Sequence, residues 1–323
     1  MRVDDVSENT KSGTSEDRRT RLTVLVALAA NLLIAVAKAV GGLIAASPAL
    51  LSEAAHSVAD SLNEVFLLAA LRRSRRPADH RHPFGYGKER FFWSLLAAVG
   101  IFVMGGCFSF FQGFEALTTP AAEESRTGYV AGLVVLGVAL LAEGASLVRA
   151  VHQVRAQPGE GVGADPALRT VLAEDSTAVA GVLLAAGGMV LHRVTGDIVW
   201  EASASLAIGV LLVYVAYRLG RSARDQLIGE AVDPELRRGI RELLDAQPEI
   251  DYLAALHTMR LGMDSTLVAA RVDLTPGIDS ERLELVSERI KRSIRNTWPE
   301  ADQVFLDVVE VPRRVRDRPP ATR

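Results

Sequence analysis

The sequence predicts an α-helical membrane protein with six transmembrane helices, followed by a C-terminal cytoplasmic α+β domain of αββαβ order. Three observations lead to this fold class: 49% of the 323 residues are hydrophobic, nearly all of the excess lies between residues 21 and 219, and the composition after residue 220 is that of a soluble domain. A hydrocarbon core about 30 Å thick needs about 20 apolar residues in helical form. The first two thirds of the chain therefore holds enough apolar sequence for several crossings.

Six segments reach the length that one crossing requires. They span residues 21–45, 48–72, 89–117, 127–153, 168–191 and 196–219. The stretch from Arg72 to Arg90 carries seven Lys and Arg residues, whereas the link at Ser47 and Pro48 carries none. Because Lys and Arg are enriched in cytoplasmic loops, we expect both termini to be cytoplasmic and the protein to lie in the cell (plasma) membrane.

Turn and capping residues predict the helices and strands of the C-terminal domain. Asp233 and Pro234 begin a helix that ends near residue 246, and Gly262 to Asp264 separate two strand-like stretches at 250–261 and 265–274. A helix over 279–296 and a strand over 302–311 complete the domain. The predicted organisation is thus a disordered tail at 1–20, a membrane domain at 21–219, a cytoplasmic domain at 220–312 and a disordered tail at 313–323.

Charge and cysteine content exclude several classes of function. The net charge of −3 gives no basic surface for nucleic acid, and the single Cys107 cannot build a thiolate metal cluster. Any metal site must therefore use His, Asp, Glu and Asn. No nucleophile and base occur at a recognised spacing, so we do not expect an enzyme.

The most informative stretch lies in the second segment, where four polar residues share one helical face. His56 and Asp60 are one turn apart, with Glu53 one turn before them and Asn63 one turn after. Ionisable groups at membrane depth are expensive, and they persist where they face a bundle interior or a watery cavity, pair with each other or bind an ion. The alternative interpretation is a polar seam between packed helices.

A second group of carboxylates lies in the fifth segment, where Glu174 and Asp175 are adjacent. Neighbouring carboxylates repel each other in an apolar surrounding unless a cation or hydrogen-bond donors lie nearby. A divalent ion shared with His56 and Asp60 would supply that charge, with Asp175 as the inner ligand and Glu174 beside it. The alternative is that Glu174 pairs with Arg169.

Four further polar residues interrupt the apolar segments. Glu143 in the fourth segment is a candidate proton-relay or supporting group, together with Glu53 and Asn63, although a packing role is equally open. Lys38 in the first segment lies close enough to the helix end to extend its ammonium to the membrane surface. Gln112 and Glu115 are expected near the end of the third helix, in contact with water.

With these residues in view, the chain resembles the cation diffusion facilitator family of divalent-metal/proton antiporters over residues 21–312. The resemblance rests on His56-x-x-x-Asp60, on the run from Pro83 to Glu89, on Asp175 with Gly181 six residues later, and on the order of helices and strands. The run from Ser52 to Ser57 and the Glu174-Asp175 pair are similar to the branch that contains mammalian zinc transporter 9.

The resemblance implies a four-ligand transport site, with two ligands from the second helix and two from the fifth. Here it implies metal ligation by His56, Asp60 and Asp175, while Val171 occupies the position of the fourth ligand and Glu174 is its candidate replacement. Some members hold a second metal between helices two and three, where this chain offers Asp79, His80 and His82. A solvated loop is the alternative there, because Tyr86 replaces a further His. The sequence argues against a full metal site in the C-terminal domain. His257 is the only histidine in that part of the sequence, with Asp273 and Asp307 as candidate additional ligands.

The function expected from the residues and the resemblance together is export of a divalent cation from the cytoplasm in exchange for protons. Imidazole and carboxylate ligands suit Zn²⁺, which we favour, and also Mn²⁺, Fe²⁺ and Co²⁺. The expected partners are the lipid bilayer and a second copy of the chain in a homodimer, with no resident cofactor. A non-transporting metal-sensing or partner subunit is the alternative, because Val171 replaces a ligand.

Overall fold

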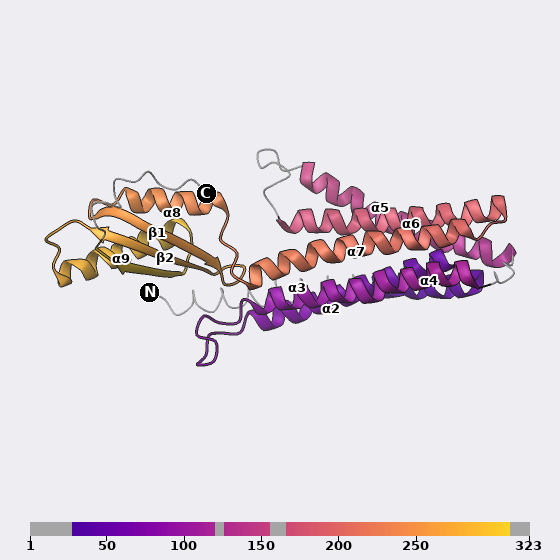
Figure 1. Ribbon diagram of the computed structural model, residues 1–323, viewed down its shortest axis with the longest axis horizontal. Helices are drawn as coiled ribbons and strands as arrows, with labels where there is room; N and C mark the ends of the chain where they lie inside the picture. Colours follow the sequence, from indigo (N-terminus) through magenta and orange to yellow (C-terminus); the bar gives the residue numbers. More distant parts are fainter. Residues whose placement is uncertain (1–27, 120–125, 156–165, 311–323) are drawn as a thin grey trace, which may run out of the picture. The chain divides into compact units, whose positions relative to one another are not determined.

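The computed structural model describes residues 28–119, 126–155 and 166–310, and most of the described chain is helical (Figure 1). The predicted tails at 1–20 and 313–323 fall outside these ranges. The third predicted segment forms α3, which continues through a π-helical stretch, η1, into α4. The long helical segments are Leu28–Ala45, α2 (Pro48–Ser74), α3 (Glu89–Gly100) with η1 (Ile101–Cys107) and α4 (Phe108–Thr118), α5 (Arg126–Arg155), α6 (Pro166–Thr195) and α7 (Val199–Leu227).

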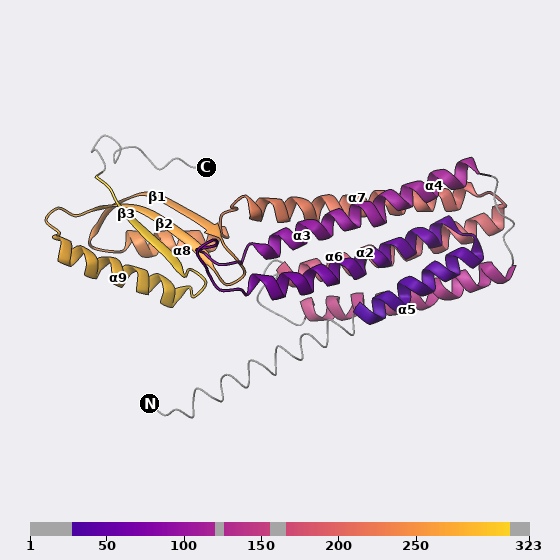
Figure 2. The same cartoon turned by 90° about the horizontal axis from the view of Figure 1, so that it is seen from below.

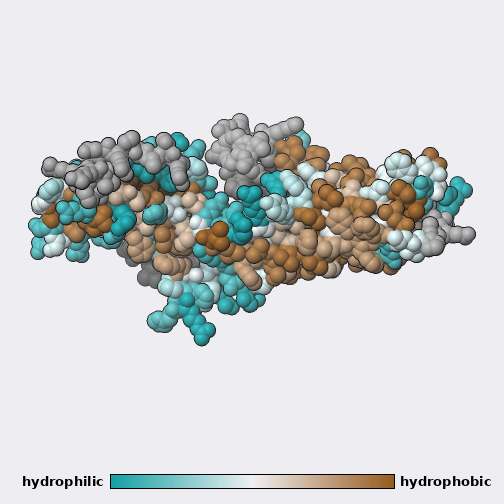
Figure 3. Space-filling model, viewed as in Figure 1, coloured by the Kyte–Doolittle hydropathy of each residue, from teal (hydrophilic) through white to brown (hydrophobic). Residues whose placement is uncertain are grey.

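Among the described residues, five helical segments are long and apolar enough to cross a membrane, by length and composition. They are Leu28–Ala45, Glu89–Thr118, Arg126–His152, Leu172–Thr195 and Val199–Leu227. Large apolar side chains cover their outer surface (Figure 3), as at Leu43, Leu141 and Val194, which are 72%, 76% and 77% exposed. Because α2 carries the polar line described above, it is less apolar than these five, and a sixth crossing remains a prediction.

The described chain forms two compact units. The first combines the described residues up to Ala69 with Trp93–Arg221, and the second combines Ala70–Phe92 with the described residues from Ser222 onward. The loop between α2 and α3 therefore belongs with the C-terminal domain. Within this second unit, the Gly87 backbone lies directly against Leu261 and Gly262, with no room for a Cβ atom.

In the helical unit, glycines bring α4 and η1 close to α7, as small residues in a membrane helix allow. A Cβ atom on Gly105 would lie 2.8 Å from the Leu212 side chain, and one on Gly113 would lie 2.7 Å from Leu206. Both distances are too short for real contacts, so a larger residue at either position would force the facing leucine side chain to move. Figures 1 and 2 both show α4 running beside α7.

A tight turn joins the first helix to α2. Ala46 adopts a left-handed conformation with φ of 50°, and the Ser47 N–H donates to the Gly42 carbonyl at 3.0 Å, which ends the helix. The Ser47 hydroxyl accepts a hydrogen bond from the Leu50 N–H at 3.3 Å, and Pro48 occupies the first turn of α2. The turn therefore fixes the start of the helix that carries the predicted ligands.

The C-terminal domain has the predicted αββαβ order, with α8 (Pro234–Asp245), β1 (Ile250–Arg260), β2 (Thr266–Leu274), α9 (Ser280–Thr297) and β3 (Gln303–Val308). The sheet order is β1-β2-β3, with β1 and β2 antiparallel and β2 and β3 parallel. The α9 helix crosses between the parallel strands, as a parallel pair requires. Apolar residues from both helices and the sheet form its core: Ile240, Leu244, Val268, Ala270, Ile290 and Ile294.

We expect Ile290→Ala to lower the stability of the C-terminal domain by about 2–5 kcal/mol, because it leaves a cavity at a side chain that is only 1% exposed. Leu285→Ala on the same helix is the matched control, since Leu285 is 73% exposed. Thermal unfolding of the purified full-length protein would measure both. Equal shifts for the two variants would contradict the assigned core.

Candidate metal centre

The polar face of α2 lies inside the helical unit, as the sequence predicts. The His56 Nε2 and Asp60 Oδ2 atoms are 3.5 Å apart, and their side chains are 5% and 36% exposed. Neither ring nitrogen of His56 has a hydrogen-bond partner among the described residues. An imidazole that is buried without a partner, next to a carboxylate that solvent reaches, is suited to ligate a cation.

The two α6 carboxylates differ in their contacts. The Asn63 side chain on α2 donates to Glu174 Oε1 at 3.2 Å, so Glu174 is the carboxylate that α2 holds. The Oδ2 atom of Asp175 is buried without a hydrogen bond to described residues, and Ser146 of α5 lies within reach of that side chain. The hydrogen bond from Asn63 therefore goes to Glu174, and the role of Asp175 as the inner metal ligand stays a prediction.

No three His, Cys, Asp or Glu side chains in the described part of the chain are grouped closely enough to hold a metal ion. The predicted ligands thus form two parts, His56 with Asp60 on α2 and Glu174 with Asp175 on α6. The Val171 side chain, at the position of the missing family ligand, falls outside the described side chains. The adjacency of the two helices is nevertheless fixed by the bond between Asn63 and Glu174.

Lys38 is part of a buried ion network and does not extend to the membrane surface, so that sequence-based interpretation is wrong. Its ammonium donates to Glu53 Oε2 at 2.9 Å, to Ser57 Oγ at 3.0 Å and to Glu143 Oε1 at 2.9 Å. All three N–H donors are used, and the Lys38 and Glu53 side chains are 0% exposed. A buried ammonium is retained at membrane depth because two carboxylates from α2 and α5 compensate it.

Gly181 on α6 makes room for this network. A Cβ atom at that position would overlap Glu53 Oε1, which is itself buried without a hydrogen bond among the described residues. The glycine six residues after Asp175 thus has a physical reason, because α6 packs its backbone against the charged end of Glu53. Lys38, Glu53 and Glu143 connect the first helix, α2 and α5, and the contact between Gly181 and Glu53 adds α6.

A further contact that the sequence interpretation missed lies beyond Asp60 on α2. Asn31 on the first helix donates to Glu64 Oε1 at 2.7 Å. Both residues are visible in the sequence as polar interruptions of apolar runs. Their pairing could not be read from spacing, because the two residues lie on different helices.

The loop between α2 and α3 brings Asp79 and His82 together, with Asp79 Oδ1 and His82 Nδ1 3.6 Å apart. The same carboxylate accepts hydrogen bonds from the His82 N–H at 2.7 Å, from the Arg81 N–H at 2.9 Å and from the Tyr86 hydroxyl at 2.7 Å. The Tyr86 bond and these backbone bonds hold the pKa of Asp79 below its usual range. The carboxylate already has a structural role in shaping the loop.

In the C-terminal domain, the candidate helpers of His257 are engaged elsewhere or separated from it. Asp307 on β3 pairs in register with Arg271 on β2 and accepts a bond from the Arg271 Nε at 2.9 Å. His257 lies on β1, opposite Ala269, so β2 separates it from Asp307. The sheet therefore gives His257 and Asp307 no shared position.

Buried side chains with nitrogen and oxygen atoms inside an apolar helical unit are typical of membrane proteins that bind or transport cations. Residues 24–228 match the model of the cation efflux transmembrane domain. The match covers more than half of the chain, and the chain therefore belongs to the cation efflux, or cation diffusion facilitator, family.

Similar proteins come from plants, animals and bacteria. The chain is 33% identical to metal tolerance protein C4 of Arabidopsis thaliana, over 87% of this chain and 62% of that protein. It is 32% identical to the mitochondrial proton-coupled zinc antiporter SLC30A9 of Xenopus laevis, over 77% and 46%, and 26% identical to the cation-efflux pump FieF of Cronobacter sakazakii, over 88% and 92%. The match thus spans less than two thirds of the first two relatives.

We expect Gly181→Ala to lower stability by about 1–3 kcal/mol, because the added methyl group must displace the Glu53 carboxylate from its bond with Lys38. Gly187→Ala on the same helix is the control, since nothing lies within 4 Å of its Cβ position. The melting temperatures of the two purified variants in detergent measure the difference. A Gly181→Ala melting point equal to that of the control would refute the close contact.

We expect Tyr86→Phe to raise the pKa of Asp79 toward its ordinary value, because the strongest of the bonds that favour the carboxylate is lost. A carboxyl group with a lowered folded pKa stabilises the fold above its unfolded pKa, and this contribution disappears as pH falls through the folded pKa. NMR titration of the labelled carboxyl carbon measures the shift. Tyr214→Phe serves as the control, and a pKa of Asp79 that is the same in both variants would contradict the prediction.

Proposed function

We propose that this protein exports a divalent metal cation, with Zn²⁺ as the favoured substrate, in exchange for protons. The observation that carries the proposal is the pair of buried His56 and adjacent Asp60 on α2, with α6 held beside it through Asn63 and Glu174. Membership of the cation efflux family and similarity to proteins named as zinc antiporters support the same conclusion. Imidazole and carboxylate ligands without thiolate suit Zn²⁺ and leave Mn²⁺, Fe²⁺ and Co²⁺ as competing substrates.

The proposed transport site consists of His56 and Asp60 from α2 with Asp175 and Glu174 from α6. In the described conformation these ligands are in two groups, and the α6 carboxylates are held by Asn63 and near Ser146. If α6 moved relative to α2, the Glu174 and Asp175 carboxylates would leave these contacts and bind the metal instead. Such a movement is the step that alternating access requires at a membrane-buried site.

Proton coupling follows from the chemistry of these ligands. A cation binds a neutral imidazole and ionised carboxylates, so its entry displaces protons and their return promotes its release. Glu53, Asn63 and Glu143 are the supporting groups in this proposal. Glu53 and Glu143 share the single ammonium of Lys38, and each keeps one buried oxygen without a partner among the described residues. A proton on that pair would relieve the excess negative charge.

For the membrane arrangement, we propose the cell membrane, α2 as a sixth crossing and both termini on the cytoplasmic side. The excess of Lys and Arg between Arg72 and Arg90 supports this orientation. We also propose a homodimer whose C-terminal domains hold the two copies together. At the loop, Asp79 and His82 remain the candidate second metal site, although the bonds that Asp79 already accepts favour the structural role.

The second candidate function is a metal-sensing or partner subunit that does not transport. Its support is the absence of a grouped metal site among the described residues, together with Val171 at a family ligand position. A protein of this kind would bind the cation saturably without moving it. Assays of the purified chain alone therefore separate the two functions.

We expect Asp60→Ala to abolish metal-driven proton flux in proteoliposomes, since the substitution removes a ligand that solvent can reach next to His56. Asp245→Ala, at an exposed position on α8, is the matched control and should retain the flux of the unaltered protein. A pH-sensitive dye inside the vesicles and a Zn²⁺ gradient give the measurement. Unchanged flux in Asp60→Ala rejects the site, and binding without flux in the unaltered protein favours the sensor.

A further inference from the structure

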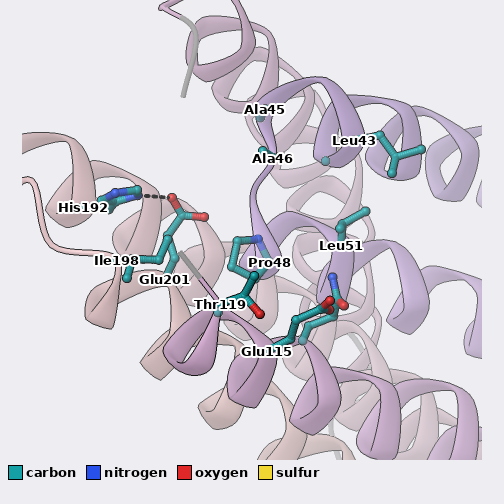
Figure 4. A pocket seen from close by; sticks show the side chains of 13 residues that line it. Leu43, Ala45, Ala46, Pro48, Leu51, Glu115, Thr119, His192, Ile198 and Glu201 are labelled. Atoms are coloured by element: carbon teal, nitrogen blue, oxygen red, sulfur yellow. Dashed lines mark hydrogen bonds and ion pairs between the residues drawn. The ribbon is translucent and has the colours of Figure 1, made fainter. Parts of the chain in front are cut away.

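A cavity with several polar lining residues lies in the helical unit, at the end where the first helix turns into α2 (Figure 4). Its volume is about 340 Å³, large enough for a hydrated ion. The walls come from the end of the first helix, the start of α2, α4, α6 and α7. The polar side chains among its lining residues are Gln112, Glu115, Thr119, His192 and Glu201.

One wall of the cavity holds a histidine whose ring is fixed by a carboxylate. His192 Nδ1 and Glu201 Oε1 are 2.6 Å apart, and the side chains are 14% and 2% exposed. The second Glu201 oxygen accepts a hydrogen bond from the Ser47 hydroxyl. Figure 4 shows the imidazole and carboxylate facing each other across the gap between α6 and α7. A histidine that donates one ring N–H to a carboxylate presents its other nitrogen as a metal ligand in many metal sites.

The opposite wall holds two oxygen-bearing side chains of α4. Gln112 is 7% exposed and lines the cavity. Its amide oxygen is a hydrogen-bond acceptor that an ion or a water molecule in the cavity would contact. One turn further along α4, Glu115 is exposed and labelled at the cavity in Figure 4.

The position of the cavity relates it to the proposed transport site. Pro48 and Leu51 on α2 line it, and His56 lies eight residues after Pro48, or about 12 Å along the helix. The Arg-rich loop lies at the other end of α2. A cation that left His56 and Asp60 away from that loop would meet this cavity next.

We propose that this cavity is a second divalent-cation site, in which His192 Nε2 and the Glu115 carboxylate bind a partly hydrated ion. Glu201 positions the imidazole, and Gln112 offers its amide oxygen. Since the described side chains form no complete metal cluster, water supplies the remaining ligands. The identity of the ion as the exported cation rests on the proposed function.

Measurement of Co²⁺ binding tests the cavity without requiring transport. In Asp60→Asn/Asp175→Asn protein, full length and in detergent, the transport site is disabled, and Co²⁺ retained in equilibrium dialysis reports the remaining sites. We expect His192→Ala in this background to lose one bound equivalent together with its absorption band. Glu115→Gln should weaken the same site about tenfold, and His152→Ala, at an exposed position on α5, should change nothing.

The alternative is that Ser47, Glu201 and His192 only lock the helix ends together. In that case His192→Ala would lower the melting temperature and leave Co²⁺ binding equal to that of the His152→Ala control, which would overturn the proposal.

A failure of the proposed transport function gives a different result in the same experiment. If the unaltered protein and Asp60→Asn/Asp175→Asn bind the same number of ions, the transport site is wrongly assigned, whereas loss of one equivalent with His192→Ala would still support the cavity.

Discussion

The helical unit depends on one buried ammonium and the two carboxylates that surround it. Lys38 donates to Glu53, Ser57 and Glu143, and removal of the ammonium would leave two carboxylates inside the helical unit without their cation. Breaking a buried pair of this kind costs about 3–5 kcal/mol. The network therefore fixes the first helix, α2 and α5 in one register. Because Gly181 brings the α6 backbone against Glu53, the same network also sets where α6 can lie.

This constraint has a consequence for the candidate transport site. His56 is one turn from Glu53 on α2, and Asp175 is six residues before Gly181 on α6, so the ligands lie beside the part of the unit that the network fixes. Beyond it, a hydrogen bond from Asn63 to Glu174 joins α2 and α6. One charged region thus holds the helices together, while a weaker polar contact lies where the ligands would have to rearrange around a cation.

The cavity near Ser47 extends the same polar path toward the other end of α2. Its His192 and Glu201 belong to neighbouring helices joined by a short turn, and no periodic pattern in the sequence links them with Gln112 and Glu115 on α4. The cavity, which Pro48 and Leu51 line, and the pair of His56 and Asp60 thus lie at successive positions along α2. Between them stands the Lys38 network, in which the carboxylates of Glu53 and Glu143 share one ammonium.

The sequence by itself determined the helical segments, the αββαβ order and the presence of His56, Asp60, Glu174 and Asp175, because hydrophobic length, strand alternation and helical spacing are local properties. It also established that Glu53 and Glu143 are polar groups in apolar surroundings. Only the tertiary structure decided their partners: Lys38 turns inward to Glu53 and Glu143, and Asn63 donates to Glu174. The physical reason is that a charge pair between helices depends on their packing, and residues more than a hundred positions apart, such as Lys38 and Glu143, leave no mark of their contact in the spacing of either segment.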